Sequence, residues 1–178
     1  MNYDDLERVD TKLMFKTYDK WPEIARNSYE KELKKFDARD IDHIVFAGMG
    51  GSGTIGDTIK AILSKQDIHV TTVKGYLLPK TVDSKTLVIV TSVSGNTDET
   101  LKILDITQKT PAMSIGFSSG GLMEEYCKKN DVFFQKIPMI HSPRASFTSF
   151  LFSILNVLGP ILPIKYNDIQ ESISSLEN

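Results

Sequence analysis

The 178-residue sequence is long enough for one domain with a sizeable core, and its 40% apolar, 25% charged and 9% aromatic residues are typical of a globular protein. A net charge of −2 argues against a general nucleic-acid or membrane surface, and no apolar run reaches the roughly 18 residues of a membrane helix. The single cysteine, Cys127, excludes a disulfide or multi-cysteine metal site within one chain, and we expect it simply to pack. The acidic N-terminus lacks the basic and apolar regions of a signal peptide, so we expect a soluble, cytoplasmic protein.

Residues 1–40 predict an N-terminal helical segment. Apolar residues recur at helical spacing between Leu6 and Leu13. Pro22 then starts a second helix, because proline is tolerated in a first helical turn, and we expect this helix to continue through Leu33. The segment should pack on the main domain, or against a partner, rather than carry chemistry.

From residue 44 the pattern changes to short apolar runs that alternate with helical periods. Such alternation predicts a parallel sheet with right-handed crossovers. We therefore expect an α/β fold, a three-layer sandwich of flavodoxin-like or Rossmann-like type with a five-stranded parallel sheet flanked by helices. The expected strands are residues 44–47, 68–73, 87–90, 112–117 and 132–134.

Turns of small residues follow three of these strands, beginning near Gly48, Ser92 and Ser118. The carboxyl ends of parallel strands lie on one edge of the sheet, where such folds bind their ligands. Glycines let the backbone approach a ligand, and a helix N-terminus directs unpaired N–H groups at it. The first two turns side by side would therefore form an anion site, most naturally for a phosphate.

The first turn matches the dinucleotide-binding fingerprint, with glycines at Gly48, Gly50 and Gly53. The full fingerprint also requires an acidic residue at the end of the second strand, for the ribose hydroxyls. Here that strand ends at Val73 and is followed by Lys74. An NAD(P)-binding Rossmann domain is therefore only a lesser alternative.

The second turn places three hydroxyl groups around Gly95, on Ser92, Ser94 and Thr97. Neutral hydroxyls together with backbone N–H groups suit a phosphate monoester, because they supply directed donors without a bulky cation. The alternative is an ordinary helix cap, in which Ser94 or Asn96 satisfies the first N–H groups of the next helix.

Two further segments follow the sheet. Residues 145–158 predict a strongly apolar helix, which must lie in the core or at a subunit interface. Residues 166–178 are polar with weak helical spacing at Ile169, Ile173 and Leu176.

Three motifs together resemble the sugar isomerase (SIS) domain, and most closely the N-terminal half of the bifunctional phosphoglucose/phosphomannose isomerases. The resemblance extends from about residue 21 to residue 160. The motifs are Gly50-Gly51-Ser52, the run from Ser92 to Thr100, and Pro143-Arg144-Ala145 before the apolar helix.

The resemblance implies a role for each motif. Gly50, Gly51 and Ser52 would line the sugar site, and the hydroxyls of the second turn would hold the phosphate. Arg144 would stabilise the negative charge of an enediolate, as a positioned cation does where charge develops. The alternative for Arg144 is an ordinary surface ion pair.

The chain departs from the family in one large respect. In those enzymes a second SIS domain supplies the glutamate base and a histidine, and a partner subunit contributes. Isomerisation requires such groups to move a proton between C1 and C2 and to open the ring. His141 is the nearest candidate, whereas Glu99 is better explained by the helix dipole, and His43 and His69 are incidental.

The hypotheses are therefore three. The chain is part of an isomerase that interconverts fructose 6-phosphate with glucose 6-phosphate or mannose 6-phosphate through an enediolate, assembled as a homodimer or with a separate second-half chain. Alternatively, it is a non-catalytic phosphosugar-binding or regulatory module, or a degenerate domain that binds nothing. Residues 41–164 would form the SIS domain, and residues 165–178 would be a tail that could begin a missing second SIS domain. No metal or cofactor is expected, because the histidines and carboxylates form no ligand-spaced cluster.

Overall fold

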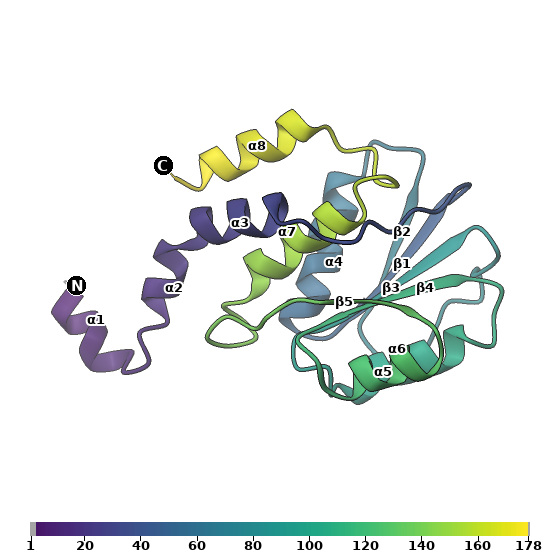
Figure 1. The fold of residues 1–178 in the computed structure, drawn as a ribbon, viewed down its shortest axis with the longest axis horizontal. Helices are drawn as coiled ribbons and strands as arrows, with labels where there is room; N and C mark the ends of the chain where they lie inside the picture. The colour runs from purple at the N-terminus through teal and green to yellow at the C-terminus, as the bar shows by residue number, and fades with distance from the viewer. Residues whose placement is uncertain (1–2, 178) are drawn as a thin grey trace.

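The computed structural model describes residues 3–177, so Met1, Asn2 and Asn178 of the expected terminal segments lie outside it. A five-stranded sheet stands between two layers of helices (Figure 1), and every paired strand is parallel, as the sequence predicts. Its strands are β1 (His43–Gly48), β2 (His69–Val73), β3 (Thr86–Ser92), β4 (Met113–Ser118) and β5 (Phe133–Lys136).

The strand order is β2-β1-β3-β4-β5. Gly48 of β1 is in register with Thr91 of β3, and Ser92 of β3 with Ser118 of β4. The turns after β1, β3 and β4 therefore meet at one edge of the sheet, as predicted. The chain reverses its order between β1 and β3, which is where open α/β sheets bind ligands.

Helices cover both faces of the sheet, and each layer has its own apolar core. The first core contains Ile44 and Phe46 of β1, and the second contains Val45 and Ala47, as expected for a strand buried on both faces. The helices beside the first core are α4 (Gly51–Ile62), α7 (Phe147–Val157), α3 (Trp21–Glu30) and α8 (Tyr166–Ser175). Those beside the second are α5 (Asp98–Thr107) and α6 (Gly121–Lys129).

Helix α7 is the apolar helix that the sequence predicts, and it lies in the core. All its residues from Thr148 to Val157 are buried, and it packs against both α3 and α4. Of the tail residues, Ile169 and Ile173 are buried against this layer, while Leu176 is exposed. Helix α8 also packs on α3, so the described tail adds to the first core.

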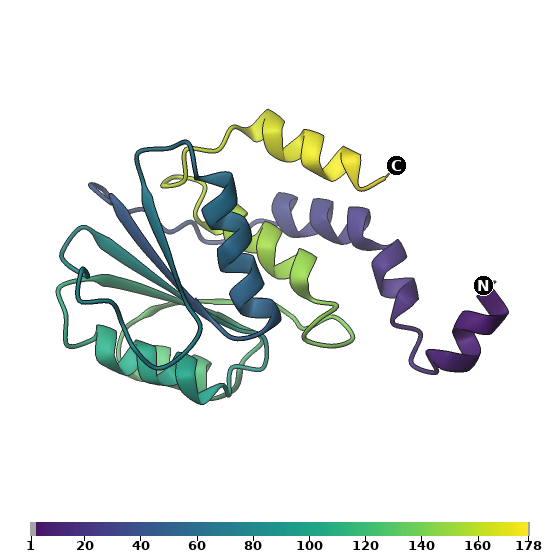
Figure 2. The same ribbon diagram turned by 180° about the vertical axis from the view of Figure 1, so that it is seen from behind.

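Helices α1 (Tyr3–Val9) and α2 (Phe15–Asp19) form an arm that extends away from the sheet (Figures 1 and 2). A series of aromatic rings joins this arm to the body: Tyr18 meets Trp21 at 4.9 Å between ring centroids, and Trp21 meets Phe147 at 6.2 Å. The predicted helical character is confirmed in α1, α2 and α3, but α1 ends at Val9, so the predicted helical spacing does not continue to Leu13, which has φ +56°.

The expected continuation of α3 through Leu33 is wrong, because the helix ends at Glu30. Asn156 of α7 donates its side-chain amide to the carbonyl of Tyr29 and, at 2.9 Å, to that of Lys31. Phe36 N–H then donates to the carbonyl of Val157 at 2.9 Å. These long-range bonds hold the chain after α3 in a non-helical path, and nothing in the local sequence reveals them.

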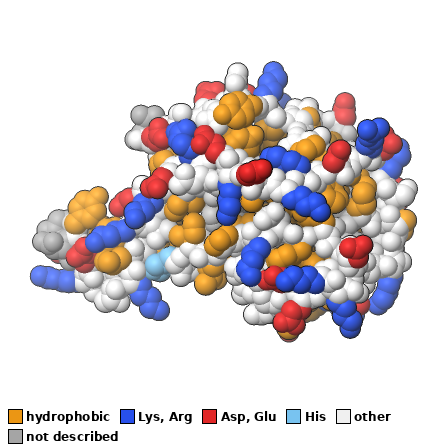
Figure 3. All heavy atoms as spheres, in the orientation of Figure 1, with side chains coloured by type: hydrophobic (Ala, Val, Ile, Leu, Met, Phe, Trp, Pro, Cys, Tyr) orange, Lys and Arg blue, Asp and Glu red, His pale blue; other side chains and the backbone are white. Residues whose placement is uncertain are grey.

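Side chains of both charge signs intermix on the face shown in Figure 3, in keeping with the small net charge. Among the residues that the structure describes, no helix has the length and apolar character needed to cross a membrane.

Candidate functional site

A cavity of about 370 Å³ lies at the carboxyl edge of the sheet, where the turns after β1 and β3 meet. It contains every predicted site residue except Gly50, which precedes α4 as its N-cap residue. The lining residues come from the first turn, the second turn and the loop before α7: Met49, Gly51, Ser52, Ser92, Val93, Ser94, Thr97, Pro143 and Arg144.

Hydrogen bonds fix the second turn in place. The Ser92 hydroxyl lies 2.8 Å from that of Thr97 and accepts the N–H of Gly95 at 3.1 Å. The Ser94 hydroxyl, which is more exposed, accepts the N–H of Asn96 at 3.2 Å. The hydroxyls therefore lie in a defined cluster, which is the arrangement that binds an anion at small reorganisation cost.

The helix-cap alternative does not describe these side chains. Thr97 is the N-cap residue of α5, yet its side chain makes no capping bond. Asn96 instead accepts the N–H of Leu122 in α6, at 3.0 Å. The backbone N–H groups of Asp98 and Glu99 bond to no described protein atom, so the N-terminus of α5 keeps free donors.

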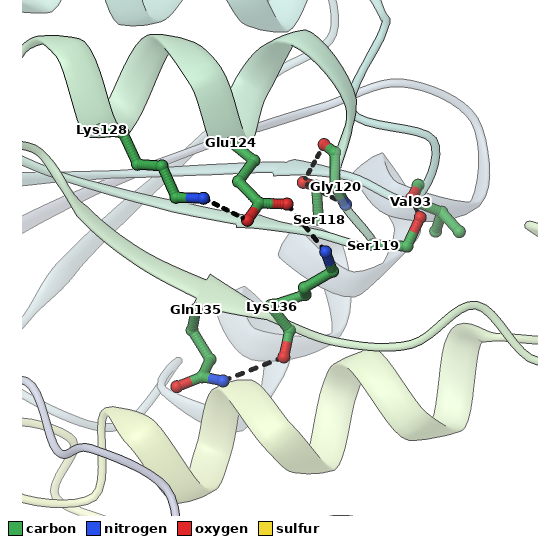
Figure 4. A network of polar contacts seen from close by, with 8 residues as sticks. All are labelled: Val93, Ser118, Ser119, Gly120, Glu124, Lys128, Gln135 and Lys136. Carbon is green, nitrogen blue, oxygen red and sulfur yellow. Dashed lines mark hydrogen bonds and ion pairs between the residues drawn. The ribbon is translucent and has the colours of Figure 1, made fainter.

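The turn after β4 supports the second turn from behind (Figure 4). Ser119 donates both its N–H, at 3.0 Å, and its hydroxyl, at 2.7 Å, to the carbonyl of Val93. Met123 N–H donates to the carbonyl of Gly95 at 2.9 Å. A Cβ on Gly95 would lie 1.9 Å from the carbonyl oxygen of Gly120. The sequence predicts the position of this third turn but not its supporting role. The run of small residues from Ser118 is the only feature of the sequence that points to that role.

The first turn is held by close backbone packing. A Cβ on Gly53 would lie 2.7 Å from the carbonyl oxygen of Gly48, so β1 and α4 approach closely. Gly50 has φ +52°, and a Cβ on either Gly50 or Gly51 would meet nothing within 4 Å. The Ser52 hydroxyl is nearly buried, lines the cavity and has no hydrogen-bond partner among the described residues. The first turn thus offers open space and one free hydroxyl.

Arg144 reaches the same cavity from the loop before α7. Its side chain is exposed, and its guanidinium makes no ion pair or hydrogen bond with any described residue. The surface ion pair that the sequence left open is therefore not observed. Arg144 is a free cation beside a cluster of hydroxyl groups.

The described residues that line this cavity include no carboxylate and no histidine. His141 is close in sequence, but its Nε2 lies 2.8 Å from the carbonyl oxygen of Lys12 in the N-terminal arm. Glu99 lies in the first turn of α5, and its negative charge raises the pKa of Tyr76. The arrangement can bind an anion and stabilise negative charge, but it supplies no evident base.

The remaining titratable candidates lie elsewhere. His43 and His69 begin β1 and β2, at the opposite edge of the sheet, and burial lowers the pKa of His43. Cys127 is buried in the second core, and this burial raises the pKa of its thiol to about 12. In the described part of the chain, no group of histidine, cysteine and acidic residues could hold a metal ion.

No family model matches the sequence. Curated relatives do match: the bifunctional phosphoglucose/phosphomannose isomerase of Caldicellulosiruptor bescii is 34% identical over 172 residues, 93% of this chain and 50% of the relative. The enzyme of the same name from Aquifex aeolicus is 35% identical, over 75% of this chain and 42% of the relative. The D-glucosamine-6-phosphate 4-epimerase of Sulfolobus acidocaldarius is 28% identical, over 78% of this chain and 42% of the relative. The chain thus spans about half the length of the curated relatives it matches.

Solved structures share the fold. Tagatose-6-phosphate ketose/aldose isomerase from Escherichia coli superimposes with a TM-score of 0.64 at 17% identity, over 92% of this chain and 52% of that chain. The C-terminal domain of glucosamine-fructose-6-phosphate aminotransferase from Francisella tularensis superimposes with a TM-score of 0.63 at 19% identity, over 93% of this chain and 52% of that chain. By sequence and by fold, the chain is a homologue of about half of a bifunctional phosphoglucose/phosphomannose isomerase, with the SIS fold of the phosphosugar isomerases.

Proposed function

We propose that this cavity binds a sugar phosphate, with the phosphate on the hydroxyls of Ser92, Ser94 and Thr97 and the sugar against the first turn at Gly50, Gly51 and Ser52. The observation that carries the proposal is the unpaired guanidinium of Arg144 on the cavity that also holds this hydroxyl cluster. An unpaired cation and oriented hydroxyl donors attract a phosphorylated, polyhydroxylated ligand.

The names of the similar proteins support the same ligand class. They include isomerases, an epimerase and an aminotransferase, whose reactions differ, but every one of these names contains a phosphorylated sugar. The feature that we propose this chain shares with all of them is therefore the phosphosugar site.

We further propose that the chain is part of a cytoplasmic aldose–ketose isomerase that interconverts fructose 6-phosphate with glucose 6-phosphate or mannose 6-phosphate. Arg144 would stabilise the enediolate oxygen as its negative charge develops. The proton transfers between C1 and C2 would use a base from a second subunit of a homodimer, or from a separate second-half chain, because the described lining residues include none.

The same lack of a base favours the alternative of a non-catalytic phosphosugar-binding or regulatory module. A nicotinamide dinucleotide is disfavoured, because its ribose would need an acidic residue at the end of β2. The residue after β2 is instead Lys74, whose ammonium pairs with Asp57 at 2.6 Å.

Calorimetric titration with glucose 6-phosphate and fructose 6-phosphate tests the binding proposal, with glucose and NAD⁺ as controls. We expect both phosphates to bind, glucose and NAD⁺ not to bind, and the variant Arg144→Met to bind the phosphates more weakly without a change in Tm. Absence of binding by any sugar phosphate would contradict the proposal and favour a degenerate domain.

An isomerisation assay then separates the two functions. We expect exchange between the two phosphates only when the proton-transfer group is present, and Arg144→Lys should lower kcat by about 10²–10³-fold. Turnover by the chain would dispose of the binding-only alternative. Binding without turnover, alone and with any second-half chain encoded beside it, would establish that alternative.

A further inference from the structure

A second cavity, of about 230 Å³, lies between α3, α7 and the segment that follows β5. It shares no lining residue with the proposed phosphosugar site. Its volume is somewhat below the roughly 300–1,000 Å³ of sites for drug-sized ligands, so it suits a smaller molecule.

Four polar side chains line this cavity without a partner among the described residues. Asn27 and Ser28 come from α3, Lys31 follows directly after that helix, and Ser153 comes from α7. Ser153 is only 5% exposed, and its hydroxyl, which is reachable from the cavity, bonds to no described residue. Its neighbour Ser149 differs, because its hydroxyl donates to the carbonyl of Ser146 at 2.9 Å. A hydroxyl that lines a cavity without a protein partner is available to hydrogen-bond a ligand or water.

The charge of the cavity is positive. Lys136 lines it and pairs with Glu124 at 2.9 Å, while Lys128 pairs with the other oxygen of the same carboxylate at 2.8 Å (Figure 4). These three residues together keep one positive charge, and the unpaired Lys31 adds a second. None of the described lining residues is acidic, so the occupant that this field favours is an anion.

Much of the cavity wall is apolar. Leu33, Ile137, Pro138 and Ile140 contribute to it, and Ile137 is almost fully buried. A ligand that contacts this wall needs a short hydrocarbon body as well as a charged group. A small organic carboxylate supplies both, whereas inorganic phosphate has no hydrocarbon body to place against these apolar residues.

We propose that this cavity is a binding site for a small organic carboxylate, whose charged group meets Lys31 and Asn27, whose polar atoms reach Ser153, and whose carbon body lies against Ile137 and Ile140. The site is separate from the phosphosugar cavity, so its failure and the failure of the proposed function are distinguishable.

Titration with isobutyrate, followed by calorimetry and by amide NMR shifts, tests the proposal. Isobutyramide is the neutral control of almost the same shape. We expect isobutyrate to bind at least about tenfold more tightly than isobutyramide, because a charge-assisted bond to Lys31 replaces a neutral one. The largest amide shifts should occur at Lys31, Ile137 and Ser153.

Variants complete the experiment. Lys31→Met keeps the aliphatic stem and should remove the preference for isobutyrate, and Ser153→Ala should weaken binding several-fold while the helix remains stable, since alanine favours helices. Lys129→Met removes an exposed charge outside the site and should change nothing. Equal affinity for the acid and the amide, shifts confined to other surfaces, or binding of inorganic phosphate at these residues without binding of isobutyrate would each overturn the proposal.

Discussion

The two turns that form the proposed phosphosugar site are built in opposite ways. The turn at Ser92–Thr97 is fixed by hydrogen bonds among its own hydroxyls and is supported from behind, where Gly95 packs against Gly120. The turn after β1 makes few side-chain bonds and leaves open space around Gly50 and Gly51. Both follow neighbouring parallel strands, so the difference arises from the residues in the turns and not from their position in the fold.

This difference suggests separate tasks. A phosphate has a fixed shape and charge, so a rigid set of donors binds it with little loss of freedom. A sugar ring needs room and a close backbone. Changes in the second turn should therefore lower stability and phosphate binding together. Changes in the first turn should be able to alter stability or sugar binding while phosphate binding is kept.

The largest effect is expected for Gly95→Ala. The new Cβ would lie 1.9 Å from the carbonyl oxygen of Gly120, at a residue with φ +73°. We expect a loss of about 3 kcal/mol in the free energy of unfolding, measured by urea denaturation, together with loss of sugar phosphate binding. Gly75→Ala is the matched control, since its Cβ would meet nothing within 4 Å at an ordinary φ. Wild-type stability in Gly95→Ala would show that the second turn is not rigid.

The next effect is expected for Gly50→Ala in the first turn. Its Cβ meets no atom, so the cost is backbone strain alone, at φ +52° and ψ −125°. We expect about 1–3 kcal/mol of destabilisation in the same measurement. Inorganic phosphate should still bind to the folded variant. Loss of phosphate binding at unchanged stability would reverse the tasks assigned to the two turns.

A smaller effect is expected for Ser92→Ala, compared with Ser94→Ala. The buried Ser92 hydroxyl bonds within the turn, so its loss should cost about 1 kcal/mol, while the exposed Ser94 should cost less. Both variants should weaken glucose 6-phosphate binding about tenfold, since each loses a hydrogen bond to a charged group. Calorimetry measures both affinities, and an unchanged affinity for glucose 6-phosphate in both variants would contradict the prediction.

The smallest effect on stability is expected for Gly51→Ala. Gly51 begins α4, and its Cβ would project into open space on the cavity. We expect Tm to stay the same or to rise slightly, because alanine favours the helix more than glycine does. Affinity for glucose 6-phosphate should fall while affinity for inorganic phosphate does not. Equal loss for both ligands would indicate that the first turn also holds the phosphate.

Much of the fold could be predicted because buried parallel strands and the helices that follow them have local patterns. The run from Leu87 to Val90 is continuous and apolar, and it lies in the most central part of the sheet. The end of α3 could not be predicted, because the side chain of Asn156 that interrupts it comes from a distant helix. The same holds for the turn after β4, whose support of Gly95 depends on tertiary packing.

The sequence by itself determined where the small-residue turns fall and which hydroxyls they carry, because glycine, serine and threonine have local conformational and hydrogen-bonding preferences. Only the tertiary structure decided that β1 lies beside β3, with β2 on its other side, so that the two turns share one cavity. It also brought Arg144 to that cavity without an acidic partner. Strand order and the pairing of charges depend on contacts between residues far apart in the chain, and local sequence patterns do not predict such contacts.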